Sequence, residues 1–244
     1  MLPHSLSHLA PLRFPSPQKG RSLVNFSKPT YAVLGLGRFG SAVARELMSD
    51  YAVVIGIDLN ETVVNRNNGI LSQVAQTDAT DIASITELGV ADCDGVVVGI
   101  GGPHVEASIL TCSLLTDMGV KNLWAKSSGT AHGRILEQIG VPHIVYPEVA
   151  MGRRVAHLVR GVNLDYVELS AGTAMVRTIL PKSAAGPLDE VDLWNRHGVK
   201  IVAVLRENQW QPVLGAIELS EGDQVQIYGG AKQVEKFARL APRP

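Results

Sequence analysis

The chain has 244 residues, of which 45% are hydrophobic and 18% are charged, and its formal net charge is -1. This length suits one or two globular domains with an ample core, and the near-neutral charge gives no sign of a nucleic-acid binder. The two cysteines are too few for a disulfide framework, which favours a reducing cytoplasm. No apolar run approaches the ~20 residues that span a bilayer, so action at a membrane would need a partner.

Residues 1–29 contain no acidic residue, several prolines and serines, and scattered lysine and arginine. Such a composition is typical of a segment that cannot bury enough apolar surface to fold. We therefore predict a disordered basic tail. Its apolar stretch at 6–12 is too short and too interrupted for a secretory signal.

The next stretch predicts a nucleotide-binding βαβ unit. An apolar run at 31–34 is followed by Gly35, Gly37 and Gly40 and then by an amphipathic helix. Gly35 permits the tight turn, Gly37 lets the backbone approach a phosphate, and Gly40 lets the helix pack closely on the strand. A second apolar run at 52–57 ends in Asp58. The amides and the macrodipole at the helix N-terminus would then form a seat for an anion.

Two charged residues refine this prediction. Asp58 stands about twenty residues after the glycines, where an acid accepts a hydrogen bond from a free ribose 2′-hydroxyl, which favours NAD or an adenine nucleotide over NADP. Arg38 lies at the N-terminus of the helix, where a cation opposes the macrodipole by a few tenths to about 1 kcal/mol. Arg38 either meets an anion or extends into water, and the two interpretations remain open.

Six strands alternating with helices predict a Rossmann-type doubly wound parallel sheet over residues 30–159. After Asp58 the predicted strands are 73–75, 95–102, 123–125 and 144–146, and the predicted helices are 61–67, 82–88 with Thr80 or Asp81 as its cap, 105–118, 131–138 and 148–158. Residues 160–165 are expected to be a linker. The fold class is therefore α/β, with a second, smaller α+β domain at 166–244, whose predicted strands are 167–169, 175–179, 200–205 and 225–228 and whose predicted helices are 188–197 and one that begins near Lys232.

Three polar residues near the predicted ligand edge of the sheet could take part in binding. Lys126 ends the fifth strand, where a phosphate contact is expected. His132 could cap its helix or donate to a phosphate, or it could be an ordinary surface histidine. Glu148 is favourably placed in a first helical turn, and it would bind a divalent cation only if symmetry brought two copies together.

Several motifs together resemble the RCK domain, the regulator of potassium conductance. These are GLGRFG from Gly35, DATDIASITELGV from Asp78, VVVGIGG, WAK and PEVAMGRRVA from Pro147. The chain is similar to cytosolic regulatory subunits of Ktr and Trk potassium uptake systems, which have an N-terminal RCK (TrkA-N) domain and a C-terminal RCK (TrkA-C) domain. The resemblance implies a regulator without catalytic turnover, controlled by ATP and ADP, with NAD or NADH bound in some relatives. It also implies dimers that assemble into an octameric ring at the cytoplasmic face of a membrane-embedded potassium translocating subunit.

The resemblance implies a nucleotide site formed by Gly35, Gly37, Arg38, Phe39, Gly40, Asp58, Leu59, Asn60, Asp78, Ala79, Ile100, Gly101, Gly102, Lys126 and His132. Arg38 would meet the terminal phosphate, Asp58 would hold the ribose, and Asp78 and Ala79 would flank the adenine. Glu148 would bind a divalent cation, Mg²⁺ or Ca²⁺, where two nucleotide domains meet.

Trp194 stands where relatives that bind cyclic di-AMP have a basic side chain, which argues against that ligand. Two other functions remain as alternatives. One is an NAD-dependent oxidoreductase, although no spacing in the second domain sets a base beside an orienting carboxylate. The other is a nucleotide-binding scaffold with no transport partner. Stable NADH absorbance would separate a regulator from an oxidoreductase, and association with a membrane subunit would separate it from a scaffold.

Overall fold

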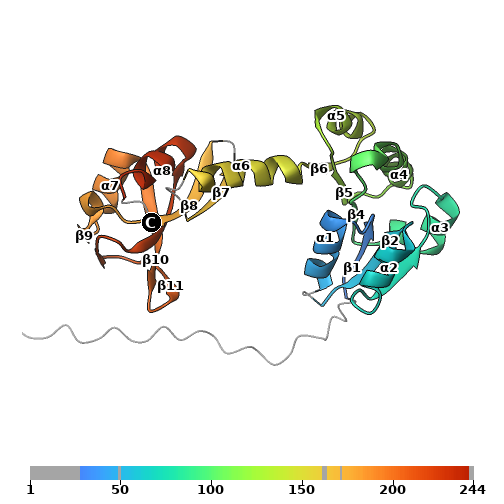
Figure 1. Ribbon diagram of the computed structural model, residues 1–244, viewed down its shortest axis with the longest axis horizontal. Coiled ribbons are helices and arrows are strands. Elements are labelled where there is room, and N and C mark those ends of the chain that lie inside the picture. The colour runs from blue at the N-terminus through green and yellow to red at the C-terminus, as the bar shows by residue number, and fades with distance from the viewer. Residues whose placement is uncertain (1–27, 49–50, 161–163, 171, 242–244) are drawn as a thin grey trace, which may run out of the picture. The chain divides into compact units, whose positions relative to one another are not determined.

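The computed structural model describes residues 28–48, 51–160, 164–170 and 172–241 (Figure 1). Most of the predicted basic tail and the middle of the predicted linker lie outside these residues. The described chain divides into two compact units. The first unit contains the residues up to Ile100 together with Leu110–Leu123, and the second contains Gly101–Ile109 together with the residues from Trp124 onward. The domain boundaries expected from the sequence remain predictions.

The first sheet has six strands in the order β3-β2-β1-β4-β5-β6. The pairings of β1 with β2 and β4, of β2 with β3 and of β5 with β6 are all parallel. This is the predicted Rossmann-type arrangement, and the strand order reverses between β1 and β4, the topological switch point at which such sheets bind ligands. The strands are β1 Thr30–Leu34, β2 Val53–Asp58, β3 Gln73–Gln76, β4 Gly95–Val98, β5 Leu123–Lys126 and β6 His143–Val145. The connecting elements are α1 Arg38–Met48, α2 Glu61–Asn67, α3 Ile82–Glu87, α4 Val105–Asp117, α5 Thr130–Gln138 and α6 Pro147–Val159, with short 3-10 turns η1 Val90–Asp92 and η2 Gly102–His104.

The central strands are buried because helices cover them, so their sequences are continuously apolar rather than alternating. Both Val54 and Ile57 of β2 are fully buried, and so are Val96 and Val98 of β4. One apolar cluster of this sheet and α1 contains Val33, Leu36, Ala44, Ala52, Val54 and Leu71.

One strand end differs from the sequence prediction, and the structure decides between the two predicted caps of α3. The strand predicted at 95–102 ends at Val98, because the following glycines turn the chain into η2. At Gly99, an added Cβ would lie 2.7 Å from the carbonyl oxygen of Gly35, so the backbone passes too close for a side chain. The cap of α3 is Asp81, one of the two predicted candidates, and its carboxylate accepts hydrogen bonds from the amides of Ala83 and Ser84.

The second sheet is antiparallel, with five strands in the order β11-β10-β13-β8-β7. Its strands are β7 Asp165–Ser170, β8 Thr173–Ile179, β10 Val199–Arg206, β11 Gln209–Pro212 and β13 Gln224–Gly230, and it packs with helices α7 Glu190–His197 and α8 Ala231–Ala238. A 3-10 turn, η3 Lys182–Ala184, leads to β9 Gly186–Pro187, which pairs with β12 Glu218–Leu219. This module has its own apolar core, which includes Val176, Ile201, Ile227 and Phe237. Strands β9, β11 and β12 were not predicted, because they are short and lack an apolar alternation.

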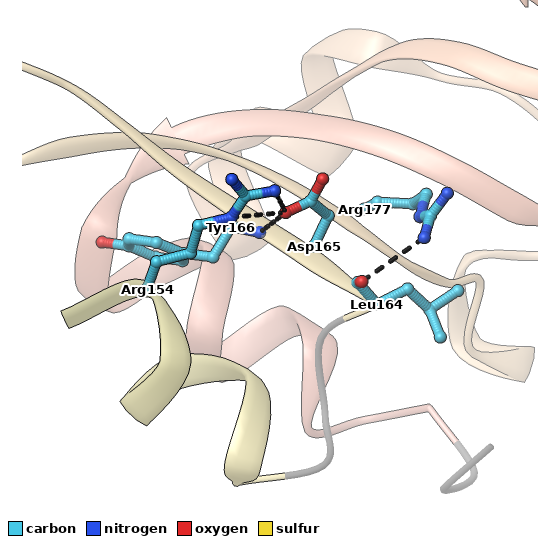
Figure 2. Close-up of polar contacts among 5 residues, drawn as sticks. All are labelled: Arg154, Leu164, Asp165, Tyr166 and Arg177. Carbon is cyan, nitrogen blue, oxygen red and sulfur yellow. Dashed lines mark hydrogen bonds and ion pairs between the residues drawn. The ribbon is translucent and has the colours of Figure 1, made fainter. Parts of the chain in front are cut away.

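Polar contacts join helix α6 to the second sheet (Figure 2). Arg154 donates from Nε and Nη2 to Oδ1 of Asp165 at 3.2 and 2.8 Å, and the same oxygen accepts from the amide of Tyr166 at 2.7 Å. Burial raises the pKa of Asp165, but these hydrogen bonds outweigh it and hold the pKa below its ordinary value. The ring of His157 stacks on Tyr166 at 3.7 Å. Since Asp165 already belongs to β7, the predicted linker 160–165 is too long at this end.

Candidate functional site

The glycine loop between β1 and α1 has the geometry that its sequence predicts. Gly35 has a φ of +87°, and its amide donates to the carbonyl of Ile57 at 2.7 Å. A Cβ on Gly35 would lie 2.7 Å from Cγ1 of Ile100, and a Cβ on Gly40 would lie 1.9 Å from the carbonyl oxygen of Gly35. A side chain at Gly35 or Gly40 would therefore force the loop, the helix and β4 apart.

Gly37 differs from these two glycines because it faces open space. Apart from its chain neighbours and its own helix backbone, no atom of the described residues lies within 4 Å of the position that its Cβ would occupy. The fold itself therefore does not need a glycine here, whereas a ligand approaching the backbone would. The amides in the first turn of an α-helix lack intrahelical carbonyl partners, and α1 has no acidic side chain in that turn. The loop thus fits a phosphate group.

Asp58 ties the loop to the end of β2. Its Oδ2 accepts a hydrogen bond from the amide of Leu36 at 2.7 Å, and its Oδ1 accepts from the amide of Asn60 at 2.8 Å. A carboxylate offers about four acceptor positions, so two amide bonds leave room for a ribose hydroxyl. The Oγ of Ser41 donates to the carbonyl of Leu36 at 2.6 Å and holds the loop from the other side. The sequence did not predict that Asp58 accepts hydrogen bonds from backbone amides, nor that Ser41 donates to the carbonyl of Leu36.

The other residues of the first unit that were predicted to contact the nucleotide differ in their burial and in their hydrogen bonds. Asp78 uses Oδ1 to accept hydrogen bonds from the amide and hydroxyl of Thr80, which shapes the turn before α3. Ala79 is buried, whereas Leu59 is 66% exposed. The side chain of Asn60 caps α2 by accepting from the amides of Thr62 and Val63. Asn60 therefore has a structural function as well as its predicted one.

Arg38 is exposed and is the first residue of α1. Among the described residues, no carboxylate pairs with its guanidinium. A cation at this end of a helix is unfavourable by a few tenths to about 1 kcal/mol unless an anion is near. The structure therefore leaves this electrostatic cost uncompensated within the described chain.

A second group of predicted residues lies in the second unit. The amide of Gly102 donates to Oγ of Ser128 at 2.9 Å, and a Cβ on Gly101 would lie 2.8 Å from that oxygen. The amide of Ser128 donates to Nδ1 of His132 at 3.1 Å. Ser128 was missed, although a hydroxyl just after a strand at the ligand edge could have suggested it.

His132 is a buried residue, so its alternative interpretation as a surface histidine is wrong. The residue is 5% exposed, and burial lowers the pKa of its imidazole. Because Nδ1 accepts a hydrogen bond, the neutral ring carries its proton on Nε2. That nitrogen is buried and has no hydrogen-bond partner among the described residues. Because buried N–H donors are almost always hydrogen-bonded, we expect a water or a ligand to accept from Nε2 of His132.

Lys126 and Glu148 form an ion pair. Nζ of Lys126 lies 2.6 Å from Oε1 of Glu148, and the two side chains are 16% and 67% exposed. Glu148 lies in the first turn of α6, as predicted. No cluster of three or more His, Cys, Asp or Glu in the described part of the chain could hold a metal ion. A cation at Glu148 would therefore need further ligands from elsewhere, such as a second copy.

The structure thus gathers the predicted residues into two groups. Gly35, Gly40, Asp58 and Ile100 meet around the loop in the first unit. The group in the second unit is Gly101, Gly102, Lys126, His132 and Glu148, held through Ser128 and the ion pair.

No helix in the described ranges has the length and apolar character needed to cross a membrane.

Comparison with known proteins identifies the family. Residues 31–147 match the TrkA-N domain. The chain is 36% identical over 216 residues to the Ktr system potassium uptake protein C of Bacillus subtilis, covering 87% of this chain and 97% of that protein. It is 35% identical over 178 residues to the Ktr system potassium uptake protein A of Vibrio alginolyticus, covering 72% of this chain and 80% of that one.

Solved structures agree on the fold. The RCK domain of GsuK superposes with a TM-score of 0.60 at 16% identity, covering 90% of this chain and 50% of that one. The GsuK channel bound to NAD gives a TM-score of 0.62 at 16% identity, covering 91% of this chain and 41% of that one. The chain thus spans about half or less of these two GsuK chains, and the likeness is one of fold. With the sequence matches, it confirms the resemblance: the chain belongs to the Ktr/Trk family of RCK-domain potassium uptake proteins.

Proposed function

We propose that the chain is a cytosolic, nucleotide-binding regulatory subunit that gates a membrane-embedded potassium translocating subunit. ATP and ADP are the proposed ligands, with NAD and NADH as the alternative. The observation that carries the proposal is the glycine loop, in which Gly35 and Gly40 are fixed by close packing while Gly37 faces open space. The names of the Ktr relatives supply the transport context, and a GsuK channel bound to NAD shows that a protein of this fold takes a dinucleotide.

Each part of the site would contribute a different interaction. The first-turn amides of α1 would bind phosphate oxygens, and Asp58 would accept from the ribose while it holds the loop. Arg38, which lacks an acidic partner in the described chain, would meet the terminal phosphate of a nucleotide bound by its own chain or by a neighbouring copy. ATP carries one phosphate more than ADP, so Arg38 is the residue that would distinguish the two.

The proposed action is regulation without turnover. A nucleotide can gate a partner only by binding one conformation of the regulator more tightly than another, and the difference in affinity sets the maximum effect. Helix α6 is a suitable element to carry that effect, since its first turn pairs with Lys126 and its later turns are bound to β7 through Arg154 and Asp165. We further propose that copies of the chain form dimers and an octameric ring at the inner face of the membrane. Two copies of Glu148 at the dimer interface would bind Mg²⁺ or Ca²⁺.

The test is potassium flux through the partner subunit reconstituted in vesicles with the full chain. We expect ATP to raise the flux and ADP to lower it, and we expect Arg38→Ala to remove the difference. In the same preparation the absorbance of NADH should stay constant with candidate substrates. Flux that ignores every nucleotide, or turnover of NADH, would contradict the proposal and favour a scaffold or an oxidoreductase, respectively.

A further inference from the structure

The buried side chain of Asn67 connects the end of α2 to the glycine loop. Its Nδ2 donates to the carbonyl of Val63 at 2.9 Å and to Oγ of Ser41 at 3.3 Å. Ser41 in turn donates to the carbonyl of Leu36, the residue before Gly37, at 2.6 Å. All of these residues belong to the first unit. A chain of hydrogen bonds therefore runs from α2 through α1 to the loop.

The direction of these hydrogen bonds is fixed by the groups that make them. The amide nitrogen of Asn67 can only donate, so the hydroxyl of Ser41 accepts from it and gives its own proton to the carbonyl of Leu36. A trans peptide points its carbonyl and the following N–H in opposite directions, and no peptide bond among the described residues is cis. The bond from Ser41 therefore sets the direction of the Gly37 amide, which points away from that hydroxyl.

Asn67 destabilises the fold through its other polar atom. The residue is 2% exposed, and its Oδ1 is buried with no hydrogen-bond partner among the described residues. A buried acceptor without a donor is unfavourable, and natural chains tend to break such a local rule where function requires it. The amide group of Asn67 is therefore present at a cost to stability, and its bond to Ser41 gives it a use.

We infer that Asn67 is a positioning residue, which acts through Ser41 to hold the amide of Gly37 in the orientation that donates to a nucleotide phosphate. The inference rests on the proposed function, because it needs a nucleotide at the glycine loop. Without these bonds the peptide between Leu36 and Gly37 is freer to rotate before the ligand arrives, and ordering it on binding costs affinity. ATP, ADP and NAD all carry a diphosphate next to the adenosine ribose, so all three should be affected alike.

The test is calorimetric titration of the full-length chain with ATP, ADP and NAD, well below the unfolding midpoint that each variant shows without ligand. Ser41→Ala removes the hydroxyl. Asn67→Ala and Asn67→Leu both remove the side-chain donor, the first by shortening the side chain and the second by replacing the amide with an apolar group. We expect each variant to bind every nucleotide that the wild type binds about 3- to 10-fold more weakly, the range of a single hydrogen bond. Ser41→Thr, which keeps a hydroxyl, should bind as the wild type does.

Two controls separate positioning from a general loss of stability. The hydroxyl of Ser72 also binds the backbone, at the amide of Val54 near the start of β2, whereas the loop meets the end of that strand. Ser72→Ala should therefore lower the unfolding midpoint and leave the nucleotide affinity unchanged. The double variant of Ser41→Ala and Asn67→Ala should bind like Ser41→Ala alone, because Asn67 acts through that hydroxyl.

The outcomes that would overturn the inference differ from those that would defeat the proposed function. Asn67 variants that bind nucleotide as tightly as the wild type would overturn the inference, and so would losses that add fully in the double variant. An equal loss of affinity in Ser72→Ala would also overturn it, since any destabilisation of the first unit would then weaken binding. A wild-type chain that bound none of the three nucleotides would instead defeat the proposed function, and the inference with it.

Discussion

Replacing Asp58 by alanine should weaken the fold as well as nucleotide binding. The amide of Leu36, which donates to Oδ2 of Asp58 at 2.7 Å, belongs to a residue that is 2% exposed. Leaving a buried donor without its acceptor costs about 1–3 kcal/mol. For a chain of this size that corresponds to a loss of roughly 2–12 °C in the midpoint of the first unfolding transition.

The matched variant is Asp58→Asn, which retains one carbonyl oxygen for the amide of Leu36 and loses only the acceptor for the amide of Asn60. The bond to Asn60 is exposed, so its loss should cost less than the loss of the bond to Leu36. Differential scanning fluorimetry without ligand should therefore rank wild type, Asn and Ala in order of decreasing midpoint. Equal midpoints for the Ala and Asn variants would refute the reasoning, because the Leu36 bond would then contribute nothing to the loop.

Three further predictions concern the loop, the helix N-terminus and α6. Gly37→Ala should keep the wild-type unfolding midpoint, because its Cβ would meet no other part of the described chain, but it should lose nucleotide affinity. Gly40→Ala should lower the midpoint strongly, because its Cβ would lie 1.9 Å from the carbonyl oxygen of Gly35. The reverse pattern in fluorimetry and calorimetry would contradict the loop geometry. Arg38→Ala should weaken ATP far more than ADP in calorimetry, whereas equal losses would show that Arg38 does not meet the terminal phosphate. Arg154→Met should destabilise the second module at pH 7. The pKa of Asp165 is held below its ordinary value of 3.8 in the folded chain, so this ion pair stabilises above that pH and the stabilisation is lost as the pH falls through the folded pKa. The difference between wild type and variant in thermal unfolding should therefore close below about pH 3.8, and a gap that persists in acid would rule out the ion pair as its cause.

The glycine loop could be predicted from the sequence because each glycine has a local geometric reason. The turn at Gly35 needs a positive φ, and Gly40 sits where its helix meets the preceding strand. The acid at the end of β2 could be placed for the same reason, since strand, turn and helix lengths fix its distance from the loop. Its bond to the amide of Leu36 could not, because that contact depends on how β2 ends beside the loop in space.

The second group of site residues shows the limit of local patterns. The burial of His132 depends on which elements cover α5, and a helical sequence alone does not specify this. The pairing of Lys126 with Glu148 joins the end of β5 to the start of α6 across more than twenty residues. From the sequence these two residues were assigned separate ligands, whereas in the structure they bind each other.

The short strands were missed for a related reason. The sequence of β11, QWQP, has a single apolar aromatic residue and ends in proline, so its strand character comes from pairing with β10 rather than from its own pattern. From the sequence, Asp165 was predicted to be the last residue of the linker. Its pairing with Arg177 of β8 places it at the start of β7 instead.

The central claim is that the loop at Gly35–Gly40 seats an adenine nucleotide. Calorimetric titration of the purified full-length chain with ATP, ADP, NAD and NADH, repeated with Gly37→Ala, tests it most directly. We expect saturable binding of at least one of these nucleotides, and a large loss of that affinity in the Gly37→Ala variant, which should unfold at the wild-type temperature. Absence of binding heat for all four compounds, or undiminished binding by the correctly folded variant, would contradict it.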